Sequence, residues 1–123
     1  MGKPRKLPSA SAFRTINLEA GMPLVREALT RMEQELARAR RDQCGLIKVI
    51  HGYGSSGTGG DIRIAVQKRL RQMQDEGSIH ACIFGEDWGQ SDARAWVLLK
   101  SQPALKGDPD LGRRNKGITI VML

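Results

Sequence analysis

The sequence contains few aromatic side chains, since Phe, Trp and Tyr together make up 4% of its 123 residues. A ligand surface built from many stacked rings is therefore excluded, and any stacking on nucleobases would depend on very few residues. Tyr53 is the only ring in the glycine-rich segment that follows residue 50. We expect Trp88 and Trp96 to anchor the packing of the core, with an exposed Trp88 as the alternative because it follows Glu86-Asp87.

Cysteine and long apolar runs are also scarce. Cys44 and Cys82 lie far apart without a C-x-x-C spacing and beside apolar residues, which predicts buried, reduced thiols. Nowhere do about 18 apolar residues follow one another, and the basic N-terminus has no apolar segment of signal-peptide length. We therefore expect a cytoplasmic protein with no membrane partner.

Acidic residues are outnumbered, because 13 Asp and Glu face 20 Lys and Arg, which gives a net charge of +7 and a pI near 10.0. An excess of this size favours polyanionic partners such as nucleic acid. A basic protein with no such partner is the alternative, since charge alone is a weak signal. A chain of 123 residues has room for one domain with a modest core, and the sequence leaves the oligomeric state open, with a monomer as a plausible state.

The hydrophobic pattern alternates between the period of strands and the period of helices. Residues 1–12, rich in Pro, Ser and basic residues, predict a flexible basic arm before a single domain over 13–123. Strands are predicted over residues 13–19, 46–50, 79–84 and 118–123, and main helices over 23–42 and 61–75. This alternation predicts a two-layer α/β sandwich of four strands, with the wholly apolar last strand inside the sheet.

The segment between the third and the last strand is less regular. Ser91 or Asp92 is a candidate N-cap for a short third helix that ends at Leu99, because Ala93, Trp96, Val97 and Lys100 follow helical spacing. A strand over residues 96–99 is the alternative. Residues 101–117 hold two prolines and several basic residues, which predicts a long basic loop.

A histidine and five glycines lie between the second strand and the second helix. Uncovered backbone N–H groups and a helix N-terminus attract anions, which predicts a phosphate-binding loop. The candidate phosphate-binding residues are Gly52, Tyr53, Gly54, Ser55, Ser56, Gly57, Thr58, Gly59 and Gly60, together with Arg63 one helical turn further on. In the alternative interpretation the glycines only supply positive φ angles for a tight turn, Thr58 or Asp61 only caps the helix, and Arg63 is an ordinary surface residue.

The same loop can be compared with two nucleotide-binding motifs. The run Gly52-Tyr53-Gly54-Ser55-Ser56-Gly57 matches G-x-G-x-x-G, with Glu86 after the third strand as the acidic partner of a dinucleotide site. However, three further loop residues precede the helix, and the chain is short for two mononucleotide halves. A Walker A loop is excluded because Gly60 is followed by Asp61.

The run Ile50-His51-Gly52-Tyr53-Gly54, followed by further glycines and by Ile62-Arg63, resembles the second motif of the small MutS-related (Smr) domain family. The resemblance covers about residues 13–123, because Gly-Glu-Asp after the third strand and Asp-Leu-Gly-Arg before the last also resemble its short, stand-alone bacterial members. It implies a βαβαββ core with a mixed four-stranded sheet, similar to the C-terminal domain of bacterial translation initiation factor three. It also implies nucleic-acid binding, and some members nick DNA or cleave RNA.

The chain departs from the family at the first strand, where the family has L-D-x-H. Here Asn17 replaces the acidic residue and Glu19 replaces the histidine. Hydrolysis of a phosphodiester needs a group that activates water and a positive charge or metal. The candidate catalytic residues are therefore His51, Glu19 and Asn17, with Mg²⁺ or Mn²⁺ as the cofactor of a nuclease. Asn17 cannot act as the base, and the alternative for Glu19 is an ordinary solvated carboxylate.

Basic residues outside the loop predict a wider contact with phosphate. Arg63, Gln67 and Arg71 fall on one helical stripe, and Arg113, Arg114 and Lys116 lie in the long loop before the last strand. These positions favour a nucleic-acid-binding domain that acts as a nicking endonuclease on DNA or RNA. The alternatives are an inactive adaptor that binds nucleic acid or ribonucleoprotein, and a nucleotide or dinucleotide binder.

Overall fold

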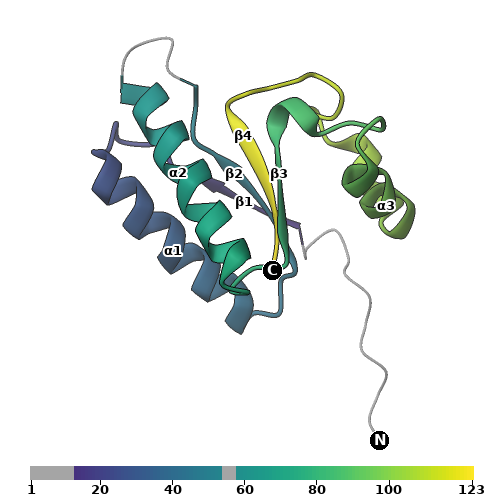
Figure 1. Ribbon diagram of the computed structural model, residues 1–123, viewed down its shortest axis with the longest axis horizontal. Coiled ribbons are helices and arrows are strands. Elements are labelled where there is room, and N and C mark those ends of the chain that lie inside the picture. Colours follow the sequence, from purple (N-terminus) through teal and green to yellow (C-terminus); the bar gives the residue numbers. More distant parts are fainter. Residues whose placement is uncertain (1–12, 54–57) are drawn as a thin grey trace, which may run out of the picture.

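Figure 1 shows the computed structural model of the protein, which describes residues 13–53 and 58–123. The elements follow the predicted order of strands and helices, with two short 3-10 helices, η2 and η3, flanking the third α-helix. Their bounds are β1 Phe13–Asn17, α1 Val25–Arg41, β2 Leu46–Ile50, α2 Thr58–Asp75, β3 Ala81–Phe84, η2 Gly85–Asp87, α3 Ala93–Ser101, η3 Pro103–Gly107 and β4 Ile118–Met122.

The four strands form one mixed sheet in the order β1-β2-β4-β3. β1 pairs with β2 in parallel, whereas β4 is antiparallel to both β2 and β3. The wholly apolar β4, yellow in Figure 1, therefore lies inside the sheet, as its lack of alternation predicts. The predicted α/β fold with a mixed four-stranded sheet is confirmed.

Both faces of the sheet are covered. α1 and α2 lie side by side on one face, where Met32, Leu36, Val66 and Leu70 pack against the strands. α3 and η3 lie on the other face, where they pack with Trp88 on a second apolar cluster. The C-terminal third of the chain thus adds a partial third layer to the two layers of the crossover helices.

The third helix is present, but its buried face differs from the one its sequence suggested. Asp92 is its N-cap and accepts hydrogen bonds from the N–H groups of Arg94 and Ala95. Ala95, Leu98 and Leu99 are the buried residues of α3. Trp96 is 49% exposed, so its prediction as a core anchor was wrong, whereas Trp88 is 1% exposed and anchors the second cluster.

Three further findings bear on the sequence-based expectations. α2 begins at Thr58, three residues before the expected start, so Gly59 and Gly60 belong to its first turn. Cys44 and Cys82 are both buried and no disulfide joins them, as predicted. Within the described ranges, none of the helices combines the length and the apolar character that crossing a membrane requires.

Candidate nucleic-acid interface

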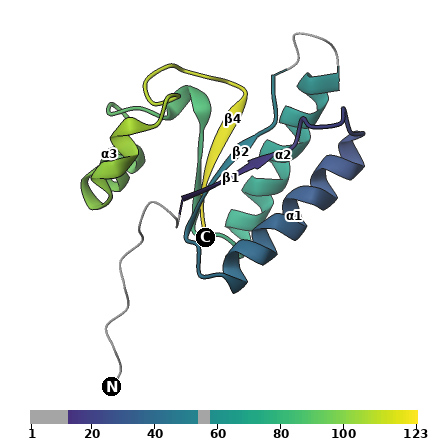
Figure 2. The same cartoon turned by 180° about the vertical axis from the view of Figure 1, so that it is seen from behind.

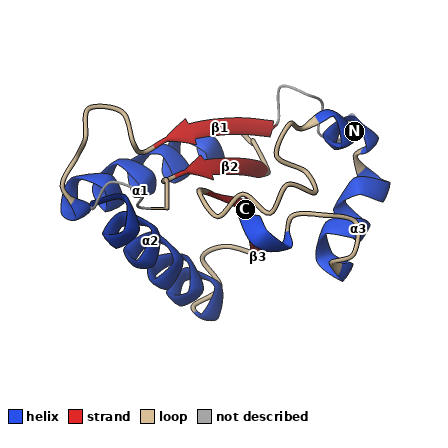
Figure 3. Cartoon of the chain, turned by 90° about the horizontal axis from the view of Figure 1, so that it is seen from above, coloured by secondary structure: helices blue, strands red, loops and turns tan. Residues whose placement is uncertain are grey.

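The carboxyl ends of the parallel strands β1 and β2 meet at one edge of the sheet, seen from above in Figure 3. Asn17 ends β1 opposite Ile50, which ends β2, and the N–H of Leu18 donates a 2.8 Å hydrogen bond to the carbonyl of Ile50. The segments after both strands are thereby held together. Crevices at such strand ends are the usual ligand sites of open α/β sheets.

Glu19 lies directly against Gly52 at this edge. Gly52 has a φ of +73°, and a Cβ at this position would overlap the carboxylate of Glu19. Asn17 Oδ1 accepts a 2.8 Å hydrogen bond from the N–H of Glu19, which fixes the turn after β1. The structure thus brings together Asn17, Glu19 and Gly52.

Gly117 connects the start of β4 to the same edge. Its carbonyl accepts hydrogen bonds from the N–H groups of His51 and Gly52, at 2.9 and 3.0 Å. Tyr53 follows, and its ring lies so close to Gly117 that a Cβ there would approach Cδ1 to 3.3 Å. We call the five residues Asn17, Glu19, Gly52, Tyr53 and Gly117 the Gly52 rim.

His51 lies beneath the Gly52 rim, with no exposed surface. Its Nδ1 is 2.7 Å from the carbonyl of Gly52, and its Nε2 is 2.9 Å from the hydroxyl of Thr119. Because a carbonyl can only accept, Nδ1 carries the proton, and the neutral ring accepts from Thr119 at Nε2. In this geometry the imidazole fixes the backbone of the loop from below.

Acidification is expected to destabilise the protein through His51. Burial lowers the pKa of His51 below its ordinary value of 6.5, although the hydrogen bond to Gly52 opposes that shift. The unfolded chain therefore binds a proton at His51 more readily than the folded protein does. The contribution of His51 to the free energy of unfolding is fully present above about pH 6.5 and is lost as the pH falls toward the pKa of the folded state. Urea unfolding between about pH 7 and about pH 5 should show this decline, and His51→Asn should flatten it. An equal decline in the variant would contradict a buried, neutral His51.

Gly52→Ala is expected to lower the free energy of unfolding by about 1–3 kcal/mol, because the new Cβ would need a positive φ and would displace Glu19. Gly45→Ala is the matched control, since Gly45 has open space around it and no positive φ. Combining Glu19→Ala with Gly52→Ala should restore the part of the loss that comes from overlap. Equal urea midpoints for Gly52→Ala and Gly45→Ala would contradict the close contact.

A buried ion network holds the basic loop on the sheet. Lys48 of β2 and Asp108 have side chains only 6% and 5% exposed, with Lys48 Nζ 2.9 Å from Asp108 Oδ1. Lys48 also pairs with Asp110. Burial by itself would lower the pKa of Lys48, but the hydrogen bonds to Asp110 and Asp108 outweigh it and raise that pKa. The indole of Trp88 donates a 3.0 Å hydrogen bond to the second oxygen of Asp108.

The network reaches the Gly52 rim through Asn115. Asn115 Nδ2 donates to Asp110 Oδ1 at 2.8 Å, and Asn115 Oδ1 accepts from the N–H of Gly117 at 2.8 Å. Gly85 leaves room for this path, because a Cβ there would overlap the carbonyl oxygens of Asn115 and Ile118. A chain of contacts therefore runs from buried Lys48 to Gly117.

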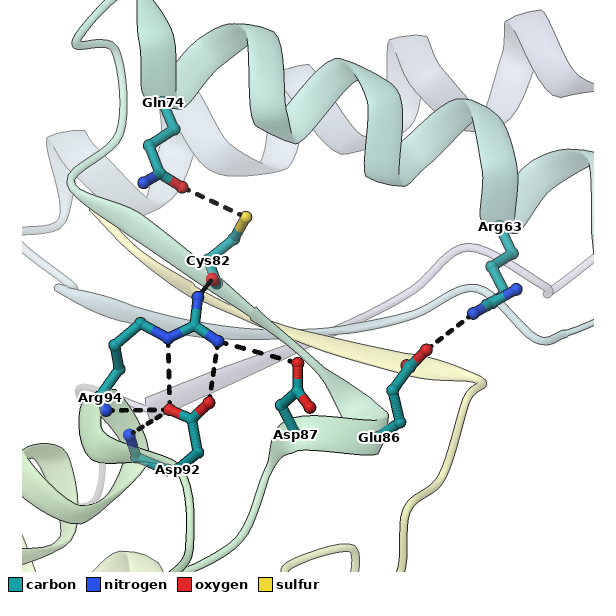
Figure 4. Close-up of polar contacts among 8 residues, drawn as sticks. Arg63, Gln74, Cys82, Glu86, Asp87, Asp92 and Arg94 are labelled. Carbon is teal, nitrogen blue, oxygen red and sulfur yellow. Dashed lines mark hydrogen bonds and ion pairs between the residues drawn. The ribbon is translucent and has the colours of Figure 1, made fainter.

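Arg63 has a partner inside the protein. Its guanidinium lies 3.0 Å from a carboxylate oxygen of Glu86 in η2, as Figure 4 shows. Arg71 lies over the ring of Phe84, 4.9 Å from its centroid. The predicted stripe of Arg63, Gln67 and Arg71 therefore faces β3 and η2, and both of its cations already have intramolecular contacts.

Arg113, Arg114 and Lys116 differ from Arg63, because they are exposed and none has an ion-pair partner within 13–53 and 58–123. Arg114 has a φ of +55°, a conformation that costs a non-glycine residue roughly 1–2 kcal/mol. Open hollows lie on both sides of these residues. The Tyr53 hollow, about 650 Å³, is lined by Tyr53, Asp110, Arg113, Arg114, Asn115 and Lys116. The Trp88 hollow, about 630 Å³, is lined by residues 86–92, Gly112, Arg114 and Lys116.

Part of the predicted phosphate loop falls outside the described residues, namely Gly54, Ser55, Ser56 and Gly57, as does the predicted arm 1–12. Thr58, Gly59 and Gly60 form the first turn of α2. The roles assigned to these residues and to His51, Glu19 and Arg63 stay predictions. Lys48, Asp108 and Asn115 were missed, although a lysine within an apolar strand is a signal that a buried carboxylate must pair with it.

The donor set for a divalent cation is small. Over residues 13–53 and 58–123, the structure gathers no three His, Cys, Asp or Glu side chains into a metal-ligand group. Glu19 supplies a carboxylate at the Gly52 rim, while Asn17 Oδ1 already accepts a hydrogen bond. Since Mg²⁺ is often held by one or two carboxylates together with substrate phosphates, the predicted use of Mg²⁺ or Mn²⁺ would involve Glu19.

The sheet does not have the geometry of a dinucleotide fold. In such a fold the strand after the glycine loop pairs in parallel within a doubly wound sheet. Here β3 pairs with antiparallel β4, and Glu86 contacts Arg63. The G-x-G-x-x-G run therefore does not lie in the parallel, doubly wound sheet that a dinucleotide site requires.

Comparison with known proteins places the fold. No family model and no curated protein matches the chain. The chain is similar to a solved structure, the crystal structure of the Smr domain of Thermus thermophilus MutS2, with 21% sequence identity and a TM-score of 0.55. The match covers 89% of this chain and 96% of that chain. The chain therefore has the fold of an Smr domain, which confirms the fold expected from the sequence motifs.

Proposed function

We propose that the protein binds the sugar–phosphate backbone of nucleic acid across the Gly52 rim and the basic segment 113–116. The observation that carries this proposal is the exposure of Arg113, Arg114 and Lys116 without any ion-pair partner among the described residues, next to Gly117 of the rim. Cations that neutralise phosphates release counterions, which makes binding favourable and sensitive to salt. The likeness to an Smr domain and the net charge of +7 support the same partner.

The backbone of Arg114 gives further support. A glycine would adopt its positive φ without cost, yet the chain has an arginine there. Backbone strain of this kind is common where a side chain is needed for function. The buried network from Lys48 to Asn115 then holds the strained segment in place.

Fluorescence anisotropy with a labelled RNA hairpin and a labelled DNA duplex tests this proposal. We expect saturable binding of at least one of them at low salt, with affinity that falls steeply as salt is added. Absence of binding to both at low salt would contradict the proposal. So would an affinity that does not change with salt.

Cleavage of the bound strand is the second part of the proposed function, and it depends on Glu19. Its carboxylate lies at the Gly52 rim, where it would reach a phosphate or a metal ion held there, whereas His51 is buried and would position the loop rather than touch the substrate. Supercoiled plasmid and structured RNA should be incubated with Mg²⁺, Mn²⁺ or EDTA. Cleavage that is lost in Glu19→Ala supports a nuclease, and binding without any cleavage supports the adaptor.

A further inference from the structure

Tyr53, one of the residues of the Gly52 rim, presents an aromatic ring to solvent. The residue is 58% exposed, although large apolar surfaces are normally turned inward. One edge of its ring lies against Gly117, and the positive φ of Gly52 aims the chain at this position. The ring is thus held in place by the backbone while much of its surface stays open.

The open side of the ring faces charged and amide groups. Tyr53 lines the Tyr53 hollow together with Arg113, Arg114, Asn115 and Lys116, and the volume of about 650 Å³ is large enough for a nucleotide. Asp110 also lines it, but that carboxylate pairs with Lys48 and accepts from Asn115. The hollow therefore offers a ring, hydrogen-bonding groups and cations that have no ion-pair partner among the described residues, and its acidic residue is already paired with Lys48.

We propose that this protein recognises unpaired strands, with one base stacked on Tyr53 and the adjoining phosphates on Arg113, Arg114 and Lys116. This inference rests on the proposed backbone binding and adds the class of substrate. A base in a duplex is stacked on both sides, so it would reach the ring only after extrusion, which breaks its pairing and stacking and weakens binding. An unpaired base has a free face, and stacking on an aromatic side chain raises its affinity roughly tenfold or more.

The surface continues from Tyr53 toward α3. The Trp88 hollow shares Arg114 and Lys116 with the Tyr53 hollow, and it shares Gln90 with a small hollow of about 100 Å³ lined by Trp96, Lys100 and Lys106. Trp96 is half-exposed, and the ammonium of Lys100 lies 4.5 Å from its ring centroid. A second ring, with Lys100 over it and Lys106 in the same hollow, therefore lies at the far end of this surface.

The acidic residues along this path have cationic partners. Glu86 pairs with Arg63, while Asp87 and Asp92 both pair with Arg94, at 3.8 and 2.9 Å. Figure 4 shows these pairs beside β3 and η2. The three carboxylates share two arginines, and Arg114 and Lys116 line the same hollow, so positive charges outnumber negative ones there by four to three and a phosphate backbone can cross it. A longer unpaired strand is thus expected to reach Trp96.

Binding of unpaired strands to matched variants tests the inference. Tyr53→Ala should weaken binding of a single strand about tenfold and weaken duplex binding by a clearly smaller factor, whereas Tyr53→Phe should bind like the wild type. A strand that carries 2-aminopurine should lose fluorescence on binding to the wild type and to Tyr53→Phe, and lose less on binding to Tyr53→Ala. Trp96→Ala should weaken the binding of a strand of about 16 nucleotides but not the binding of one of about 4 nucleotides. Val97→Ala, at an exposed neighbouring position, is the control and should change neither.

The outcomes separate this inference from the proposed function. If the wild type binds no nucleic acid, the proposed function itself fails. If it binds, but Tyr53→Ala retains wild-type affinity and the same quenching of 2-aminopurine, the stacking inference is wrong and backbone binding stands. Equal weakening of duplex and single strand in Tyr53→Ala would also overturn it.

Discussion

Lys48→Met is expected to lower the free energy of unfolding by about 3–5 kcal/mol, because it removes the cation from two carboxylates that the fold holds around it. Asp108 is 5% exposed and cannot regain water without opening the loop. Methionine keeps nearly the length of the lysine chain, so the loss would report charge rather than a cavity. Lys68→Met, at an exposed position on α2, is the matched control. Urea unfolding followed by circular dichroism measures both.

A double substitution separates charge from packing in this network. Asp108→Asn removes one of the carboxylates that Lys48→Met leaves buried, and its amide oxygen can still accept from Trp88. The pair of substitutions should therefore recover part of the stability lost in Lys48→Met. If the free energies of unfolding of Lys48→Met and Lys68→Met differ by less than about 1 kcal/mol, Lys48→Met does not leave a buried carboxylate without a compensating charge, and the account of this network is contradicted.

The triple variant Arg113→Gln, Arg114→Gln and Lys116→Gln is expected to lose most of its affinity for nucleic acid. If each residue neutralises one phosphate of a single strand, the slope of log affinity against log salt should become shallower by about 2, at about 0.7 per contact. The matched control replaces Arg26, Arg41 and Lys68 with glutamine. These residues are exposed on α1 and α2, and their substitution removes the same number of positive charges. Anisotropy titrations over a salt series measure both.

The control triple variant distinguishes a located contact from a general effect of net charge. It should weaken binding slightly, because the whole protein becomes less positive, and it should keep the wild-type slope. Equal slopes for the two triple variants would mean that segment 113–116 is not the main phosphate contact.

The sequence predicted the fold well because each element depends on its own periodicity and caps. The bounds of β2, Leu46–Ile50, are those predicted, and the apolar pattern of residues 118–122 placed the last strand inside the sheet. Ser91 and Asp92 were the two candidate caps of α3, and the cap is Asp92, whose side chain acts on its own helix. Local signals of this kind can be recognised in the sequence without knowledge of the tertiary structure.

The contacts that shape the candidate site could not be predicted from the sequence in this way. Arg63 pairs with Glu86 across 23 positions of the chain, and Lys48 with Asp108 across 60. Trp96 was expected to anchor the core, yet Ala95, Leu98 and Leu99 fill that face of α3 and leave the ring outside. Long-range pairs and competition among apolar residues for one face are decided by tertiary packing, which periodicity does not encode.

Backbone amide shifts recorded while an unpaired oligonucleotide is added test the central claim most directly, because they report where the ligand lies. We predict the largest changes at Gly52, Tyr53 and residues 113–117, with smaller ones near Trp96. Gly45, Ser78 and Leu123 belong to the opposite end of the strands and should change little. Changes centred on that opposite end, with the Gly52 rim unaffected, would contradict the account.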